Sequence, residues 1–199
     1  MSRLLLETIK CLNGKLCNLE YHQTRFDLTR KINFSLFEKV DLNTMVKIPE
    51  EFKFGLSRCR IIYSEKIEKI EFLPHQIKKI NTLKLVEDDT IDYQFKYYDR
   101  TKLNTLFEKR EYCDDILIVK NSCITDSSAA NPIFFDNGKW WTPDSPLLPG
   151  TQRAKLISER QIFVCKITPD DLSKFTKVGL INALQDMNEM PIIDIRNIF

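Results

Sequence analysis

Two short segments constrain this fold most: a run of small residues after an acidic one, and a Pro-Gly turn about twenty residues later. Asp126 precedes Ser-Ser-Ala-Ala and Asn131, so backbone or a planar ligand can come close to the carboxylate. Residues 147–153, Leu-Leu-Pro-Gly-Thr-Gln-Arg, predict a tight turn that opens a helix. The N–H groups at a helix start favour an anion. A cofactor with a basic ring nitrogen and a phosphate would suit both segments.

Hydrophobic periodicity and turn residues predict a mixed α/β chain. Asn13-Gly14 and Asn137-Gly138 predict two-residue hairpins between strands. Further strands are expected over residues 59–63, 67–72, 77–86, 116–119 and 162–166, and helices over residues 20–32, 35–46, 100–111 and 151–159. On the first helix, one face should carry Tyr21, Arg25, Leu28, Thr29 and Ile32.

A polar break at residues 87–90 suggests a domain boundary, which gives a small α+β domain over residues 1–90 and a larger one over residues 91–199. At Thr168, the Thr-Pro-Asp-Asp sequence predicts an N-cap, a proline at the first helical position and an acidic residue at the third.

Composition excludes several classes of protein. The 30 basic and 28 acidic residues leave a net charge of +2, too small to suggest a nucleic-acid or membrane-surface partner. No apolar run approaches the roughly 18 residues of a membrane span, and no signal-peptide pattern is present, so a cytoplasmic location is expected. The six cysteines form no CxxC pair and there are two histidines, so no metal site is expected.

The motifs together resemble those of a known family. The run from Asp126 to Asn131 is followed by Phe134, Thr142-Pro143, Leu148-Pro149-Gly150 and Arg153. This order and spacing resemble the fold type IV pyridoxal-phosphate (PLP) enzymes, which include the class IV aminotransferases and 4-amino-4-deoxychorismate lyase. The resemblance is closest to the lyase, in a shortened form without the family's leading strand. It implies an α/β (α+β) fold of two domains, the larger with a barrel-like sheet.

In this family a lysine holds PLP as an imine and moves protons. Lys96 matches it, because it precedes a predicted helix, is followed four residues later by Arg100, and lies 126 − 96 = 30 residues before Asp126. Lys102 is the rival, although it falls within the helix on its expected solvated side.

The resemblance assigns further residues to the cofactor. Asp126, where the family usually has glutamate, would pair with the protonated ring nitrogen; the alternative is an aspartate that only organises a turn. Arg25, in a leucine, histidine, arginine pattern, would bind the phosphate; the alternative is a helix-surface arginine. The remaining cofactor residues that the resemblance implies are Asn131, Leu148, Gly150, Thr151, Gln152, Asn182 and Ala183. Of these, Gly150 to Gln152 would form the phosphate cup, with a plain loop-to-helix junction as the alternative.

The substrate side of the site is less typical of the family. The glycine- and arginine-rich loop of the lyases is replaced by residues 64–69, which contain no glycine. Arg58 and Arg60 are the candidates to contact a substrate carboxylate.

The resemblance implies a lyase that eliminates pyruvate from an amine substrate to give 4-aminobenzoate, a step of folate biosynthesis. The alternatives are an aminotransferase acting on a branched-chain or D-amino acid, and a PLP-binding protein without turnover. A homodimer is expected, because family members complete each active site from the neighbouring subunit. Phe34, Phe37, Phe52 and Phe54 also form more aromatic surface than a small domain needs.

Overall fold

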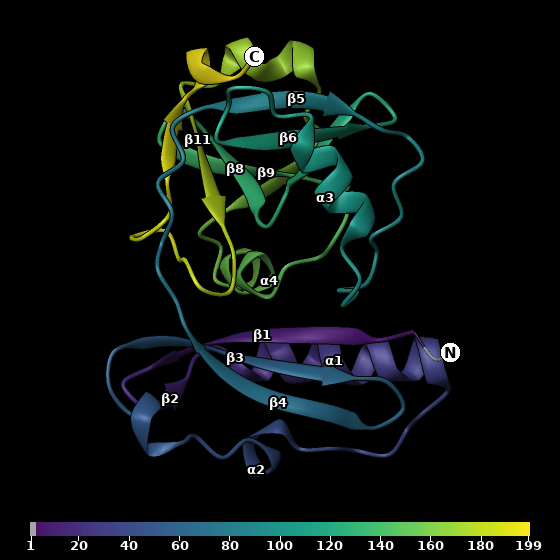
Figure 1. The fold of residues 1–199 in the computed structure, drawn as a ribbon. Helices are drawn as coiled ribbons and strands as arrows, with labels where there is room; N and C mark the ends of the chain where they lie inside the picture. The colour runs from purple at the N-terminus through teal and green to yellow at the C-terminus, as the bar shows by residue number, and fades with distance from the viewer. Residues whose placement is uncertain (1–2) are drawn as a thin grey trace. The chain divides into compact units, whose positions relative to one another are not determined.

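A computed structural model describes residues 3–199, and the chain divides into two compact units, each described by itself (Figure 1). The first unit contains the residues up to 77 together with residues 95–99, and the second contains residues 78–94 and 100–199. The change of unit at residue 77 comes earlier than the boundary expected near residue 90, and the chain returns briefly to the first unit. The division into domains 1–90 and 91–199 stays a prediction.

The first unit is built on an antiparallel sheet in the order β2-β1-β3-β4. Its strands are β1 (Leu5–Leu12), β2 (Lys15–Leu16), β3 (Leu56–Tyr63) and β4 (Ile67–Pro74). The predicted hairpin between β1 and β2 is confirmed, since Asn13 and Gly14 both have positive φ, at 49° and 72°. Asn13 and Gly14 therefore have the conformation that a two-residue turn requires.

Helix α1 (Leu19–Phe34) packs on one face of this sheet, with the ring of Phe26 4.6 Å from that of Tyr63. The face that the sequence groups together is only partly buried: Thr29 is 3% exposed, whereas Leu28 and Ile32 are 54% and 56% exposed. The helix also buries His22 and Phe26, and His22 hydrogen-bonds a glutamate on the inward face of β1.

The prediction of a helix over residues 35–46 is wrong. Helix α1 ends where Ser35 adopts a left-handed φ of 56°, and only α2 (Leu42–Met45) forms within the range. Asp41 caps α2 by accepting a hydrogen bond from the N–H of Asn43 over 2.9 Å, which favours a new start there. A 3-10 turn, η1 (Glu50–Phe52), precedes β3.

The second unit contains two sheets. The three-stranded sheet has the order β5-β6-β7, with β5 (Leu83–Glu87), β6 (Asp115–Lys120) and β7 (Cys123–Ser127). The five-stranded sheet has the order β10-β9-β8-β11-β12, with β10 (Phe163–Cys165), β9 (Lys139–Pro143), β8 (Asn131–Asp136), β11 (Lys177–Ile181) and β12 (Ile192–Asp194). Strand β5 is shorter than the strand expected over residues 77–86, since residues 77–82 form no strand.

One hydrophobic core joins strands of both sheets, including Leu117 on β6, Phe134 on β8 and Val178 on β11. The helices of this unit are α3 (Thr101–Glu108) and α4 (Thr151–Ser158), with 3-10 turns η2 (Pro169–Lys174) and η3 (Ile195–Asn197). The predicted Asn137-Gly138 hairpin joins β8 to β9, and the predicted capping box at Thr168 is present. The mixed α/β class expected from the sequence is confirmed.

Candidate functional site

In the second unit, the candidate site is organised around the carboxylate of Asp126. This residue lies on β7 and is 6% exposed, and its role as the partner of a ring nitrogen stays a prediction. Its Oδ1 accepts a hydrogen bond of 2.9 Å from the side-chain amide of Asn131, and its Oδ2 accepts one of 2.9 Å from the N–H of Leu148. The two segments that the sequence singled out therefore meet at this carboxylate.

The surroundings of Asp126 disfavour its ionised form. Burial raises its pKa, while hydrogen bonds from Leu148 and Asn131 and the positive charge of Arg153 lower it, and the balance is about 7. The donors that directly contact its oxygens are neutral amides, and they compensate only part of the cost of burying a charge. A cationic group beside Asp126 would favour its ionised form.

Asn131 and Gly150 show why the turn before α4 requires a glycine. The Asn131 amide also donates to the carbonyl of Leu148 over 3.0 Å, so it ties β8 to the turn. A Cβ atom at Gly150 would collide with the side-chain oxygen of Asn131. Gly150 is the N-cap of α4, and Thr151 and Gln152 are buried in its first turn. This places the first-turn N–H groups of a helix close to the Asp126 segment.

Two further contacts hold the turn that follows Asp126. The guanidinium of Arg100 donates a 2.8 Å hydrogen bond to the carbonyl of Ser128. The amide of Asn182 donates to the carbonyl of Ala129 over 3.4 Å, while its side-chain oxygen accepts from the N–H of Leu184 over 2.9 Å. The structure thus brings the predicted Asn182 and its half-buried neighbour Ala183 to the same turn.

In the first unit, the central feature is a fully buried carboxylate, that of Glu7 on β1. Arg25 donates two hydrogen bonds to it, 2.8 Å from Nε to Oε1 and 2.6 Å from a terminal nitrogen to Oε2. His22 Nδ1 lies 2.6 Å from Oε2. Burial alone would raise the pKa of Glu7, but the charge of Arg25 and the hydrogen bonds from His22 and Arg25 lower it to about 2.

The sequence analysis gave Glu7 no role, although a signal was available. Glu7 lies between Leu5 and Ile9 on the inward side of an alternating strand, where a charge needs partners. His22 and Arg25, three residues apart on a helix, supply them. The phosphate-binding role of Arg25 stays a prediction, and the structure adds that its guanidinium is paired with Glu7.

Lys96 lies on a short segment that docks beside β1. The N–H of Leu6 donates to the carbonyl of Lys96 over 2.9 Å, and the N–H of Tyr98 donates to the carbonyl of Leu4 over 3.0 Å. Lys96 is half-buried, whereas its rival Lys102 is exposed on α3. The attachment of a cofactor to Lys96 stays a prediction.

Arg58 and Arg60 lie on the sheet face opposite to α1. Register places Lys10 directly across from Arg58, and the side chains alternate along each strand. Arg60 forms a 2.8 Å ion pair with Glu71, whereas the buried Nε atom of Arg58 has no hydrogen-bond partner in the structure of residues 3–199. This face therefore carries a surplus of positive charge.

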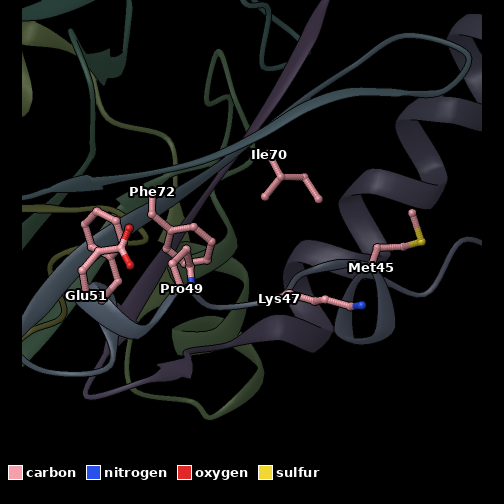
Figure 2. A pocket seen from close by; sticks show the side chains of 7 residues that line it. Met45, Lys47, Pro49, Glu51, Ile70 and Phe72 are labelled. Carbon is pink, nitrogen blue, oxygen red and sulfur yellow. The ribbon is translucent and has the colours of Figure 1, made fainter.

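The first unit also has a groove (Figure 2). It is lined by Met45, Lys47, Pro49, Glu51, Phe52, Ile70 and Phe72. None of the predicted site residues lines it. Among residues 3–199, no three side chains of His, Cys, Asp or Glu are grouped to hold a metal, and no helix is long and apolar enough to cross a membrane.

Comparison with known proteins identifies the family. Residues 94–195 match the model of the family named amino-transferase class IV. An uncharacterised protein of Haemophilus influenzae is 38% identical over 185 residues, which are 92% of this chain and 98% of that protein. A solved structure from Haemophilus somnus, named as a candidate 4-amino-4-deoxychorismate lyase, is 38% identical, with a TM-score of 0.86 over 94% of this chain and 99% of that one.

A PLP-bound hypothetical aminotransferase from Mycobacterium tuberculosis has the same fold, at 12% identity and a TM-score of 0.78, over 96% of this chain and 80% of that one. These matches, with the fold described above, define an enzyme of the PLP-dependent aminotransferase or lyase type. The chain belongs to the class IV aminotransferase family. The family and fold inferred from the sequence are therefore confirmed, and the alternative without turnover is not retained.

Proposed function

We propose that this enzyme is a PLP-dependent lyase that eliminates pyruvate from 4-amino-4-deoxychorismate or a closely similar amine. The observation that carries the proposal is the 38% identity, over nearly the whole of both chains, to the Haemophilus somnus protein named as a candidate lyase of this kind. Identity at this level over this length supports a shared chemistry more strongly than the fold alone, which serves many functions.

The second unit fits the ring of PLP. Asp126 is a buried carboxylate whose hydrogen-bond donors are neutral and whose pKa is raised to about 7. A protonated ring nitrogen would supply the missing positive charge, and a carboxylate has room to accept a third hydrogen bond. Leu148, half-buried beside this pair, is proposed to cover one face of the ring.

The turn before α4 fits the phosphate. The N–H groups of a helix start attract an anion, and Gly150 is the N-cap of α4. Thr151 and Gln152 are proposed to bind there, with Asn182 and Ala183 from the neighbouring turn. Arg25 is proposed to add a guanidinium to the phosphate, in addition to its pair with Glu7.

When bound, PLP withdraws electrons from the carbon that bears the substrate's amine. Lys96 is the proposed covalent attachment point, and its amine then removes the proton from that carbon. Asp126 holds the positive charge of the ring nitrogen in place while negative charge develops. Breaking the carbon–oxygen bond releases the three-carbon fragment, which is protonated to pyruvate, and leaves an aromatic amine.

Arg58 and Arg60 are proposed to bind the carboxylates of the substrate. Among the described residues, the buried Nε of Arg58 has no hydrogen-bond partner, and such an unsatisfied donor is costly unless a ligand or water bonds it. Lys10 lies opposite in register and adds positive charge to the same face. A substrate with two carboxylates is favoured over one with a purely apolar side chain.

The second candidate function is an aminotransferase, which the family name supports. Both reactions use the same lysine and the same ring partner. They differ in the product: the lyase releases pyruvate, whereas the aminotransferase passes the amine to a keto acid.

We also propose that the enzyme works as a two-fold dimer with a small-molecule amine as its substrate. In the first unit, Phe37 and Phe54 are 73% and 87% exposed, and Leu28 and Ile32 expose an apolar strip of α1. A symmetric copy that covered these exposed side chains would be the commonest kind of partner.

The experiment that tests the function starts from the absorption spectrum of protein purified with PLP, which should show a visible band that borohydride removes. Pyruvate release from 4-amino-4-deoxychorismate is then measured alongside keto-acid-dependent amino transfer. Pyruvate without amino transfer supports the lyase. Amino transfer without pyruvate supports the second candidate instead.

A further inference from the structure

The sheet of the first unit packs one face against α1, and its opposite face is rich in cations. Cross-strand register and the alternation of side chains decide which residues of β1, β3 and β4 belong to that opposite face. Its charged members are Lys10, Arg58, Arg60, Lys69 and Glu71. Four positive charges therefore share this face with one carboxylate.

The carboxylate of Glu71 is already paired with two of these cations. Arg60 donates a 2.8 Å hydrogen bond to its Oε1, and the ammonium of Lys69 lies 2.5 Å from its Oε2. The guanidinium of Arg60 also lies over the ring of Tyr98, 5.7 Å from the ring centroid. Both oxygens of Glu71 therefore have a cationic partner, and neither partner is Arg58.

Arg58 and Lys10 are neighbours within this face. They are register partners on adjacent antiparallel strands, where the Cβ atoms of facing residues are about 5 Å apart. Lys10 is 8% exposed, and the buried Nε of Arg58 has no hydrogen-bond partner among the described residues. Burial lowers the pKa of His75, and the positive charges of Arg58 and Lys10 lower it further. Two adjacent and poorly solvated cations repel each other, so an anion bound between them would relieve that cost.

We propose that Lys10 and Arg58 together bind a carboxylate remote from the amine of the substrate, so that the site favours an amine with a carboxylate across a ring. An ammonium and a guanidinium can donate hydrogen bonds to the same carboxylate. The Nε atom of Arg58 is a donor that such a ligand would satisfy. The inference rests on the proposed function, because it assigns a position to the substrate of that reaction.

The position of the Lys96 segment explains why this carboxylate is the remote one. The N–H of Leu6 donates to the carbonyl of Lys96 over 2.9 Å, and Leu5 forms an antiparallel bridge with Tyr97. Leu6 and Lys10 are four residues apart on β1, which corresponds to about 13 Å along the strand. An α-carboxylate is attached to the carbon that bears the amine, whereas a carboxylate across a ring extends much further along β1. The second kind of substrate therefore fits this separation better.

The test uses the full chain loaded with PLP and two probes, 4-hydroxybenzoate and phenol. Neither probe can form an imine with PLP, and they differ only in the carboxylate. Lys10→Met and Arg58→Met should each weaken the binding of 4-hydroxybenzoate about tenfold or more, because a hydrogen bond to a charged group is lost. Neither variant should change the binding of phenol. The double variant should lose less affinity than the product of the two single effects, since both residues bind one carboxylate.

Lys69→Met is the matched control, because it removes a positive charge from the same face at a side chain that is 61% exposed. It should change the binding of 4-hydroxybenzoate less than about twofold. Arg60→Met should have a smaller effect than Arg58→Met, since Arg60 is paired with Glu71 and remains the candidate for the second carboxylate. Arg58→Lys and Lys10→Arg keep the charge and should retain more affinity than the methionine variants, as direct binding of a carboxylate requires.

Equal binding of 4-hydroxybenzoate by the wild type, Lys10→Met and Arg58→Met would overturn the inference. Absence of binding by the wild type at millimolar concentration would also overturn it. An equal loss in Lys69→Met and Arg58→Met would mean that only the summed charge of the face matters. Failure of the proposed function gives a different result: amino transfer without pyruvate release contradicts the lyase even where 4-hydroxybenzoate binding still depends on Lys10 and Arg58.

Discussion

The side-chain amide of Asn131 lies 2.9 Å from Oδ1 of Asp126 and joins two strands of the second unit at the candidate cofactor site. The same amide group donates to the carbonyl of Leu148, whose N–H in turn donates to Oδ2 of Asp126. The carboxylate is therefore held on both sides before any ligand arrives. Such preorganisation is what a charge partner needs to stabilise a transition state.

Asp126→Asn should retain PLP but lose turnover. The amide keeps the shape of the site and removes the negative charge, so the ring nitrogen is no longer held protonated. The expected loss is about 2–4 kcal/mol of transition-state stabilisation. It is measured as the ratio of kcat/KM values at matched PLP occupancy. Wild-type turnover in this variant would remove Asp126 from the site.

Asp126 should also make the apo protein less stable as the pH rises. Its folded-state pKa, about 7, lies above its ordinary value of 3.8, so the folded state binds the proton more tightly than the unfolded state. The resulting stabilisation is fully present below pH 3.8 and is lost as the pH rises through about 7. Asp126→Asn should remove this component, which urea titrations of both proteins at pH 5 and pH 8 would reveal. Parallel losses in the two proteins would contradict the assignment.

Glu7 should make the protein less stable as the pH falls. Its pKa is lowered from 4.5 to about 2, so its stabilisation is present above pH 4.5 and is lost as the pH falls towards 2. The shift corresponds to about 3 kcal/mol of the free energy of unfolding. Glu7→Gln should remove it and flatten the acid limb of the stability curve. Glu108→Gln, at a side chain that is 75% exposed, is the control and should change stability by less than about 1 kcal/mol.

Lys96 should carry the cofactor. Its segment is docked on β1 and the side chain is half-buried, whereas Lys102 is exposed. Borohydride treatment of the PLP-loaded enzyme, followed by peptide mapping, should place the label on Lys96. Lys96→Ala should abolish the visible band, and Lys102→Ala should keep it. A label on Lys102 would reverse the assignment.

The dimer is expected to depend on the exposed aromatic residues of the first unit. Phe37→Ser/Phe54→Ser removes side chains that are mostly exposed, so the fold of each subunit should survive. Sedimentation equilibrium should show at least tenfold weaker association, about 1.4 kcal/mol or more. Tyr112→Ser, 75% exposed in the second unit, is the control. An active wild-type species near 23.5 kDa at micromolar concentration would rule the dimer out as the working form.

Local chemistry made several elements predictable from the sequence. Asn13-Gly14 and Asn137-Gly138 form the predicted turns because these residues tolerate positive φ. Thr168 caps the next turn because its side chain and that of Asp171 satisfy backbone groups within the same segment. Neither case requires information from distant parts of the chain. The spacing of motifs from Asp126 to Arg153 was likewise sufficient to indicate the family.

Tertiary structure determined which residues distant in the sequence lie in contact. Glu7 meets His22 and Arg25 from fifteen and eighteen residues away, and the segment of Lys96 docks on the strand of Glu7 from far along the chain. With these contacts, α1 buries the polar side chain of His22 and exposes the apolar side chain of Leu28. The sequence by itself determined the turns, the caps and the family. The environment of each charged group depended on burial, which only the folded chain creates.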